Sequence, residues 1–403
     1  MRLQPENQAD PSHAGLYIHV PFCVRKCVYC DFYSITDLDR IEAYVQGLQK
    51  EMALTEAAGL AFDTVYLGGG TPSVLGPEHL EAILGAVSDC FCLSSRPEVT
   101  LEANPNTVCR DRVASWMACG VNRINIGVQS FDDTRLAFLK RLHSGKQAHC
   151  AIRSVRTAGM NNVGLDLIYG LPDQRPEEWL DDLKEAVQYA PEHLSCYMLT
   201  YEQGTPLYRL YKQGRVRALE EDRVRALFDL TVGFLTDMGY EQYEISNFSQ
   251  EKIFRSRHNQ KYWDHTPYIG LGPSAHSFRE KKRSWNHADL TRYLAELAQG
   301  HLPVESFEIL NRSQLMLETV YLGLRTSTGI RIDRFKERFH VDFYEYFDEA
   351  FEELDRRGLQ GLVAYSPEQY VLTDEGRAFA DAVASVFAAY VLDADGHRNR
   401  STA

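Results

Sequence analysis

The sequence predicts an α/β fold, a partial (β/α)6 barrel followed by a mainly helical, winged-helix-like domain. Strand-like and helix-like segments alternate about six times between residues 15 and 215, which indicates parallel strands joined by right-handed crossovers. Polar or glycine-rich residues follow most of the strand-like segments, where parallel α/β folds place their sites. About six units are too few for a closed eight-stranded barrel, so we expect an open side.

The barrel elements follow from apolar periodicity. Leu80, Ile83, Leu84 and Val87 recur at helical spacing after Pro77, which is favoured in the first turn of a helix. The predicted strands are 16–20, 64–67, 98–102, 123–128, 162–168 and 193–200, and the predicted helices are 38–57, 77–92, 111–119, 132–139, 146–158 and 176–189.

The pattern changes after about residue 215. A long helix is predicted over 218–238 and a short strand over 242–245, before an aromatic, loop-rich stretch at 246–290. Further on, a hairpin near 362–371 lies among helices predicted at 313–325, 331–339, 342–357 and 373–390. This combination is typical of winged-helix modules, which bind DNA in some proteins and pack against partners in others.

These changes predict how the chain is divided. The expected parts are a flexible N-terminus (1–14), the barrel (15–215), a connecting, aromatic-rich region that closes the site (216–299), a C-terminal helical domain (300–392) and a flexible tail (393–403).

Composition narrows the function classes. The net charge of −13 over 403 residues argues against bulk nucleic-acid binding, and we expect no nucleic-acid partner. No apolar run approaches the roughly 18 residues that a membrane span needs, and the first residues lack the basic-then-apolar order of a secretory signal. These features predict a cytoplasmic protein, as a monomer or a homodimer, and leave transient contact with membrane proteins open.

Three of the nine cysteines fall within eight residues. An odd number of cysteines in a long chain without a signal does not indicate a disulfide framework. Cys23, Cys27 and Cys30 have CxxxCxxC spacing, which can hold three irons of a [4Fe–4S] cluster and leave the fourth open to a small molecule. The alternatives are an incomplete zinc site, near which only His19 lies, or structural thiols spaced by chance.

The CxxxCxxC loop after a first strand resembles the radical S-adenosylmethionine superfamily. In that superfamily the amino and carboxylate groups of S-adenosylmethionine chelate the open iron. Tyr29 matches an aromatic residue that packs against the adenine there, and Gly68-Gly69-Gly70-Thr71-Pro72 matches a glycine-rich strand end that contacts the methionine amino group. Glycine permits this close approach because it has no Cβ.

The resemblance is closest to the oxygen-independent coproporphyrinogen oxidase group of this superfamily, over residues 15–380. The shared motifs are YIHVPFC, GGGTPS, GVQSF and DLIYGLP. The resemblance implies that S-adenosylmethionine contacts Tyr17, Tyr29, Gly69, Gly70, Thr71, Glu102, Gln129, Arg141 and Asp166. The residues alone leave alternatives: Glu102 can be an exposed acid at a strand end, and Arg141 can be a surface residue of a helix with no binding role. Asp166 lies in an apolar strand, so its carboxylate needs a hydrogen-bond or charge partner.

One residue separates the two branches of this group. The coproporphyrinogen III dehydrogenases (HemN) carry a further cysteine two places after the third, whereas this chain has Phe32, the pattern of the haem chaperones (HemW). The resemblance therefore implies haem binding and transfer to haem-accepting proteins. The alternative is oxidative decarboxylation of coproporphyrinogen III to protoporphyrinogen IX, which a phenylalanine in place of a thiol disfavours.

Two histidines are candidate haem ligands. His258 lies in a stretch, His258-Asn259-Gln260-Lys261-Tyr262-Trp263, that resembles the HNxxYW region of the chaperones. Imidazole is a common axial ligand of haem iron, although a histidine here can equally belong to a polar loop network. His276 is the second candidate, and His19 is expected to support the cysteine loop.

Overall fold

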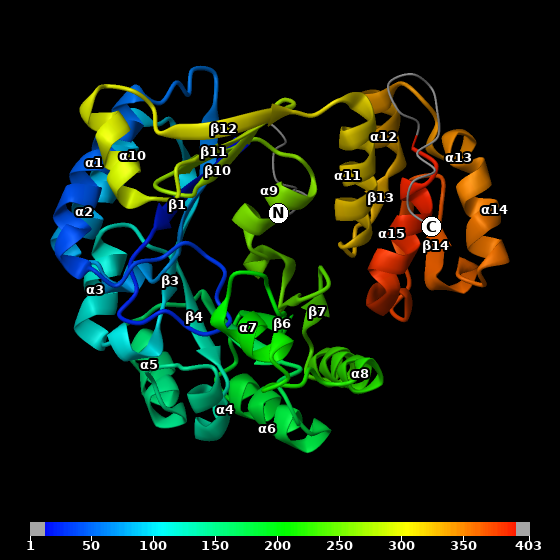
Figure 1. Ribbon diagram of the computed structural model, residues 1–403, viewed down its shortest axis with the longest axis horizontal. Coiled ribbons are helices and arrows are strands. Elements are labelled where there is room, and N and C mark those ends of the chain that lie inside the picture. Colours follow the sequence, from blue (N-terminus) through cyan, green and yellow to red (C-terminus); the bar gives the residue numbers. More distant parts are fainter. Residues whose placement is uncertain (1–12, 392–403) are drawn as a thin grey trace, which may run out of the picture.

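The computed structural model describes residues 13–391, in which a large sheet with outer helices lies beside a separate group of C-terminal helices (Figure 1). The flexible ends expected at 1–14 and 393–403 fall outside the described residues, except that His13 and Ala14 belong to the first strand. The sheet has twelve strands in the order β12-β11-β10-β9-β1-β2-β3-β4-β5-β6-β8-β7.

The predicted barrel is confirmed as six parallel strands in sequence order. The strands are β1 (His13–Val20), β2 (Ala61–Gly69), β3 (Leu93–Ala103), β4 (Arg123–Gln129), β5 (Val163–Tyr169) and β6 (His193–Met198). The helices between them are α1 (Ile41–Leu54), α2 (Pro77–Cys90), α3 (Arg110–Ala118), α4 (Asp133–Phe138), α5 (Gly145–Thr157) and α6 (Pro176–Val187). Parallel pairing brings the carboxyl ends of all six strands to one edge.

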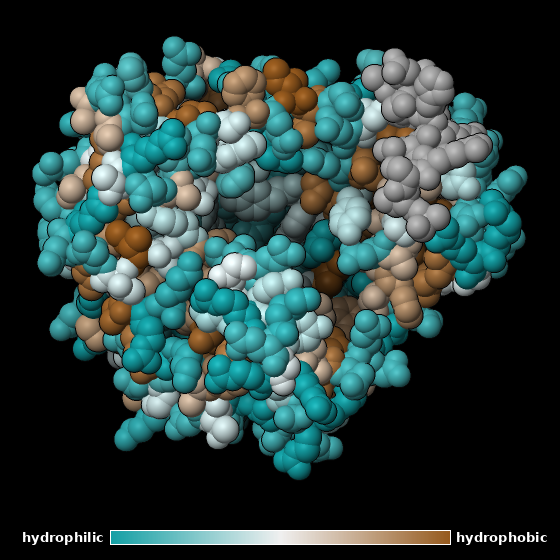
Figure 2. Space-filling view, viewed as in Figure 1, coloured by the Kyte–Doolittle hydropathy of each residue, from teal (hydrophilic) through white to brown (hydrophobic). Residues whose placement is uncertain are grey.

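The barrel is open beside β6. The short β8 (Asn247–Ser249) pairs with only the first three residues of β6, and β7 (Glu241–Gln242) follows as the edge strand. Tyr197 and Met198, at the carboxyl end of β6, are 41% and 47% exposed because no outer strand covers them. Figure 2 shows a hollow near the centre of the molecule, between the barrel and the C-terminal helices.

The region expected to be loop-rich extends the sheet instead. β9 (Tyr268–Leu271) pairs in parallel with β1, and β10 (His276–Arg279), β11 (Lys282–Asn286) and β12 (Val304–Ile309) add antiparallel strands. These strands are too short to give a clear alternation of apolar residues. The helices of this part of the chain are α7 (Pro206–Lys212), α8 (Glu221–Asp237), α9 (Arg257–Trp263) and α10 (Leu290–Ala298).

The C-terminal unit is mainly helical, as predicted, and has its own apolar core. Its helices are α11 (Arg312–Leu324), α12 (Ile332–Phe339), α13 (Phe343–Tyr346), α14 (Asp348–Arg356) and α15 (Ala380–Ala388), with a small sheet of β13 (Ile330–Arg331), β15 (Gln369–Leu372) and β14 (Val363–Tyr365). β12, which lies after the expected boundary at residue 300, pairs with β11 of the large sheet. Within residues 13–391, no helix is both long and apolar enough to cross a membrane.

A buried carboxylate joins α1 to the β9–β12 extension. Glu51 is 2% exposed and accepts hydrogen bonds from the Gly272 amide (2.7 Å), the Asn286 side chain (2.5 Å) and the Tyr293 hydroxyl (2.6 Å). Burial raises the pKa of Glu51 to about 7, although these hydrogen bonds favour the charged form. The contact fixes the loop between β9 and β10 against the barrel.

We expect Glu51→Ala to lower the free energy of unfolding by about 2–4 kcal/mol, because it leaves three buried donors without an acceptor. Urea denaturation followed by circular dichroism measures the loss. Glu42→Ala, at an exposed position of the same helix, is the control and should change stability little. Equal stability of the two variants would contradict this role for Glu51.

Candidate functional site

The cysteine loop follows β1 and is fixed at its base. The Cys23 amide donates to the Ile35 carbonyl (2.9 Å), and the Ile35 amide donates to the Pro21 carbonyl (2.7 Å). Further along, the Val28 carbonyl accepts from the Leu207 amide (2.9 Å), at the start of α7. The eight residues that carry the three thiols are therefore tied to the sheet and to a distant helix.

Two of the three thiols contact side chains from outside the loop. The Cys23 sulfur lies 3.3 Å from the Thr71 hydroxyl, and the Arg141 guanidinium donates to the Cys27 sulfur at 3.4 Å. Within residues 13–391, no three histidine, cysteine or acidic side chains converge as a ready metal-ligand group. Burial raises the pKa of the Cys23 thiol and that of the Cys30 thiol, the latter to about 11, so bare thiolates are unfavourable here.

The donor set nevertheless fits a cluster with one open iron. Three cysteines share one short loop, and the Arg141 guanidinium lies beside the Cys27 sulfur. Cys23, Cys27 and Cys30 would hold three irons, and the cluster would supply one-electron chemistry to the bound small molecule.

The glycines at the end of β2 fit tightly against the cysteine loop. Gly69 has φ +100°, and a Cβ there would lie 2.5 Å from the His19 ring. A Cβ on Gly70 would lie 2.7 Å from the carbonyl oxygens of Val20 and Phe22. His19 itself supports the cysteine loop, as expected, since its Nε2 lies 2.9 Å from the Tyr33 carbonyl. A larger residue at Gly70 would displace the backbone at the start of the cysteine loop, and one at Gly69 would displace the His19 ring.

Glu102, at the carboxyl end of β3, is directed toward this glycine turn. Its carboxylate accepts from the Tyr66 hydroxyl at 2.7 Å and from the Gly69 amide at 3.2 Å. Burial is the main cause that raises the pKa of Glu102 to about 7, with the Asp166 charge adding to it. Glu102 is therefore half-buried and hydrogen-bonded, not an exposed strand-end acid.

Gln129 and Arg141 meet beside β4. Gln129 has φ +68°, an uncommon backbone conformation for a non-glycine residue, and its side-chain oxygen is buried without a partner among the described residues. The Arg141 guanidinium donates to the Gly127 carbonyl at 2.8 Å. Gly127 keeps this space free, because a Cβ there would lie 3.0 Å from the Gln129 amide nitrogen. A buried, unpartnered amide oxygen is suited to a polar ligand.

Asp166 lies inside β5 and has the partner that its burial requires. The Asn125 side chain donates to it at 2.7 Å from β4, and burial raises the pKa of Asp166. Tyr17, on β1, places its hydroxyl 3.1 Å from His19 Nδ1 and stacks near the Tyr66 ring at 6.2 Å. The Tyr29 ring packs against a small apolar cluster that is separate from the barrel core.

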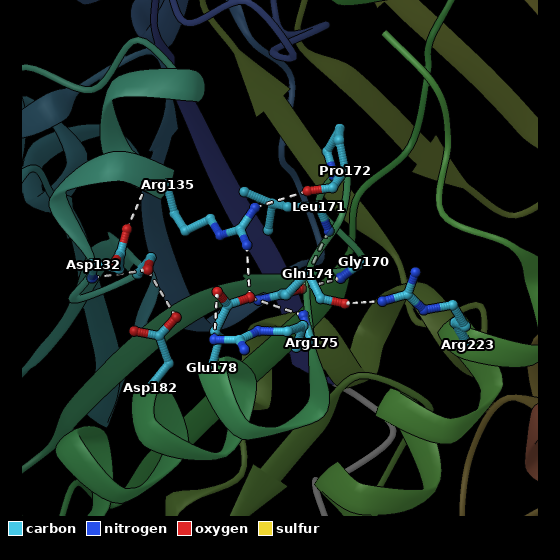
Figure 3. A network of polar contacts seen from close by, with 11 residues as sticks. Asp132, Arg135, Gly170, Leu171, Pro172, Gln174, Arg175, Glu178, Asp182 and Arg223 are labelled. Carbon is cyan, nitrogen blue, oxygen red and sulfur yellow. Dashed lines mark hydrogen bonds and ion pairs between the residues drawn. The ribbon is translucent and has the colours of Figure 1, made fainter.

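The loops that follow β4 and β5 are held together by a polar network (Figure 3). Arg135 donates to the Pro172 carbonyl at 2.8 Å and to Glu178 at 2.7 Å. Gln174 accepts from the Gly170 amide at 2.8 Å, and Asp182 accepts from the Phe131 amide at 2.6 Å. These contacts anchor both loops to α6. They fix the carboxyl ends of β4, which carries Gln129, and of β5, which carries Asp166.

The two candidate haem ligands lie in different surroundings. His258 is 1% exposed, and both ring nitrogens are engaged, Nδ1 with the Thr64 hydroxyl and Nε2 with the Tyr262 hydroxyl, each at 2.9 Å. His258 is therefore part of a polar network, which was the alternative to haem ligation that the sequence left open. His276 is exposed and stacks on Trp285, with the ring centres 5.8 Å apart.

Sequence reasoning missed two polar residues of the barrel interior. Tyr66 links β2 to Glu102, and Arg123, at the start of β4, is 1% exposed with guanidinium atoms that lack partners among the described residues. Arg123 and Asn125 alternate with Ile124 and Ile126 along β4. This period-two pattern was the signal, because it places both polar side chains on one face of the strand.

Comparison with known proteins agrees with this architecture. Residues 17–186 match the Radical SAM superfamily and residues 310–379 match the HemN C-terminal domain. The heme chaperone HemW of Mycobacterium tuberculosis is 35% identical over 379 residues, which cover 92% of this chain and 93% of that protein. The HemW of Escherichia coli is 32% identical over 390 residues, with 93% and 98% covered. The chain belongs to the HemW family.

Two other matches show the breadth of this family and the fold. The mitochondrial radical S-adenosyl methionine domain-containing protein 1 of Mus musculus is 31% identical over 413 residues, which cover 98% of this chain and 92% of that protein. The Escherichia coli coproporphyrinogen III oxidase HemN superposes with a TM-score of 0.81 at 22% identity, over 94% of this chain and 91% of that one. The second match supports the fold alone. Membership of the radical SAM superfamily implies a [4Fe–4S] cluster and S-adenosylmethionine.

We expect S-adenosylmethionine to bind about tenfold more tightly at pH 8 than at pH 6. The pKa of Glu102 is raised to about 7, so its carboxyl is mainly protonated at pH 6 and charged at pH 8, when it can accept hydrogen bonds from a ribose diol. Anaerobic calorimetry across this range measures the change. Glu102→Gln should bind weakly with a flat profile, and a flat profile in the parent protein would contradict the role of Glu102.

Serine at any one of Cys23, Cys27 and Cys30 is expected to remove the brown colour and most of the iron after anaerobic reconstitution, because a cubane needs all three thiolates. Iron and sulfide analysis measures the loss. Cys90→Ser, at an exposed cysteine outside the loop, is the matched control and should retain the cluster. Full iron content in a loop variant would contradict the assignment.

Proposed function

We propose that this chain is a haem chaperone, which binds haem and transfers it to haem-accepting proteins. The observation that carries the proposal is the alignment with heme chaperone HemW relatives over more than nine-tenths of the chain. The [4Fe–4S] cluster and S-adenosylmethionine occupy the barrel, held by the residues that surround the cysteine loop and the strand ends. The cytoplasmic location and the state as monomer or homodimer belong to the same proposal.

Phe32 supports this choice over the dehydrogenase. Its ring is 63% exposed beside the cysteine loop, at the position where the dehydrogenases carry another cysteine. A phenyl ring cannot lose a proton or donate a hydrogen atom as a thiol can, so chemistry that depends on that thiol is absent. The second candidate is oxygen-independent coproporphyrinogen III dehydrogenase, favoured by the fold shared with HemN.

Two reactions on one reconstituted sample test the proposal. Under anaerobic conditions with S-adenosylmethionine, a reductant and coproporphyrinogen III, we expect no protoporphyrinogen IX. The same sample titrated with haem should develop a saturable Soret band, and the haem should pass to an added apo-acceptor. Rapid decarboxylation without haem binding would favour the dehydrogenase and overturn the proposal.

A further inference from the structure

Basic residues gather around the cysteine loop, in three segments that contain no acidic residue. The segments are 22–30, which carries the three cysteines, 138–142, at the end of α4, and 203–219, which includes α7. Leaving aside Arg141 of the candidate ligand site, their seven basic residues are Arg25, Lys26, Lys140, Arg209, Lys212, Arg215 and Arg217. We call these seven residues the basic collar. They run against the charge of the whole chain, which has 56 acidic residues and 43 lysines and arginines.

The three segments pack on one another through a small apolar cluster. Leu139 and Leu207 lie in this cluster, and Val28, Tyr29 and Val216 pack against it. The hydrogen bond from the Leu207 amide to the Val28 carbonyl, at 2.9 Å, ties the start of α7 to the cysteine loop (Figure 1). Because the apolar side chains of all three segments meet in one cluster, the cations next to them in the sequence lie on the outside of the same assembly.

The cations of the basic collar are exposed and unpaired. All seven are exposed, and none forms an ion pair or a side-chain hydrogen bond in the part of the chain that the structure describes. Lys212 lies over the Tyr208 ring, with its Nζ 5.9 Å from the ring centre. Arg25 and Lys140 line the same small pocket as Cys27. The basic collar therefore reaches the residues that would hold the cluster.

The basic collar does not stabilise the fold by itself. Exposed cations without acidic neighbours gain nothing from pairing, and like charges on one surface repel one another. Apolar side chains are exposed among them, since Val24 is 50% exposed, Leu142 36% and Tyr211 41%. Arginines and tyrosines are enriched at protein–protein interfaces, and a positive patch steers a negatively charged partner toward it. The basic collar therefore fits the acidic face of another protein.

We propose that the basic collar is the docking surface of an acidic protein that carries one electron at a time. The cysteine loop that the basic collar surrounds would hold a cluster of one-electron chemistry, and a carrier docked there comes close to its thiols. One electron then leaves the reduced carrier and enters the oxidised cluster, and no bond forms or breaks. This inference goes beyond the proposed haem-chaperone function, and it depends on the cluster that membership of the superfamily implies.

An anionic membrane is a weaker match for the same surface. A helix that lies on a membrane buries a broad apolar face among the lipids, whereas α7 has only seven residues and directs Leu207 into the apolar cluster instead. The pocket beside Cys27, lined by asparagines and threonines as well as cations, adds relief that a flat lipid surface cannot follow. A folded protein can match both the charge and the relief.

Charge reversal on α7 tests the surface without altering the cysteine loop. We expect the double variant Arg209→Glu, Lys212→Glu to weaken the binding of flavodoxin, a small acidic one-electron carrier, to the full-length reconstituted protein by at least about tenfold at low salt. Anaerobic calorimetry measures the affinity. The control Lys50→Glu, Arg153→Glu makes the same change in net charge at exposed positions of α1 and α5, and should bind as the parent does. Equal weakening by both double variants would overturn the inference, because it would be an effect of net charge alone.

The rate of cluster reduction tests the electron transfer. In anaerobic stopped-flow absorbance, reduced flavodoxin should reduce the cluster of the α7 variant at least about tenfold more slowly than that of the parent. Photoreduced 5-deazariboflavin, which is small and uncharged, should reduce both at the same rate, because it needs no docking surface. Iron analysis and circular dichroism verify that the variant contains the cluster and is folded. Equal rates with flavodoxin would contradict the inference, and so would binding of the parent to phosphatidylglycerol vesicles but not to flavodoxin.

Discussion

The parallel pairing of β1 to β6 is the constraint on which the site depends. Because six strands run in one direction, residues far apart in the sequence reach one edge of the sheet at their carboxyl ends. The register places Gly127 opposite Asp166, and it places Glu102 opposite Asn125, so the polar side chains of neighbouring strands meet. The cysteine loop contributes the three thiols, and the strand ends of the sheet contribute the polar residues around them.

The sequence predicted the features that are carried by neighbouring residues and missed those that depend on contacts between distant segments. The cysteine spacing and the glycine run were readable because their chemistry lies within a few consecutive residues. The β9–β12 extension was not readable, since its short strands are stabilised by pairing with β1 and with one another. The environment of His258 was also hidden, because its partners Thr64 and Tyr262 come from β2 and from its own helix.

Two buried carboxylates of this fold, Glu51 and Glu102, are stabilised by neutral donors, whereas the buried Asp63 is paired with Arg257 and Lys261. Glu51 and Glu102 accept hydrogen bonds from backbone amides and tyrosine hydroxyls. Burial raises the pKa of each to about 7, so near neutral pH each exists in both protonation states. Glu51 joins the sheet extension to the barrel, so its role is to stabilise the fold. Glu102 lies at the candidate ligand site, where its role is to bind.

The edge strand β12 has a consequence for self-association. All six of its residues are exposed, and Phe307 and Ile309 place apolar side chains beside unpaired backbone groups. Such an edge is a template for intermolecular β-pairing. Glu305 and Glu308 lie on opposite faces because successive side chains alternate, and Glu308 is paired with Arg283 of β11 at 2.9 Å. Two copies that met edge to edge would bring the Glu305 carboxylates of both copies to the shared edge, which disfavours aggregation through this strand.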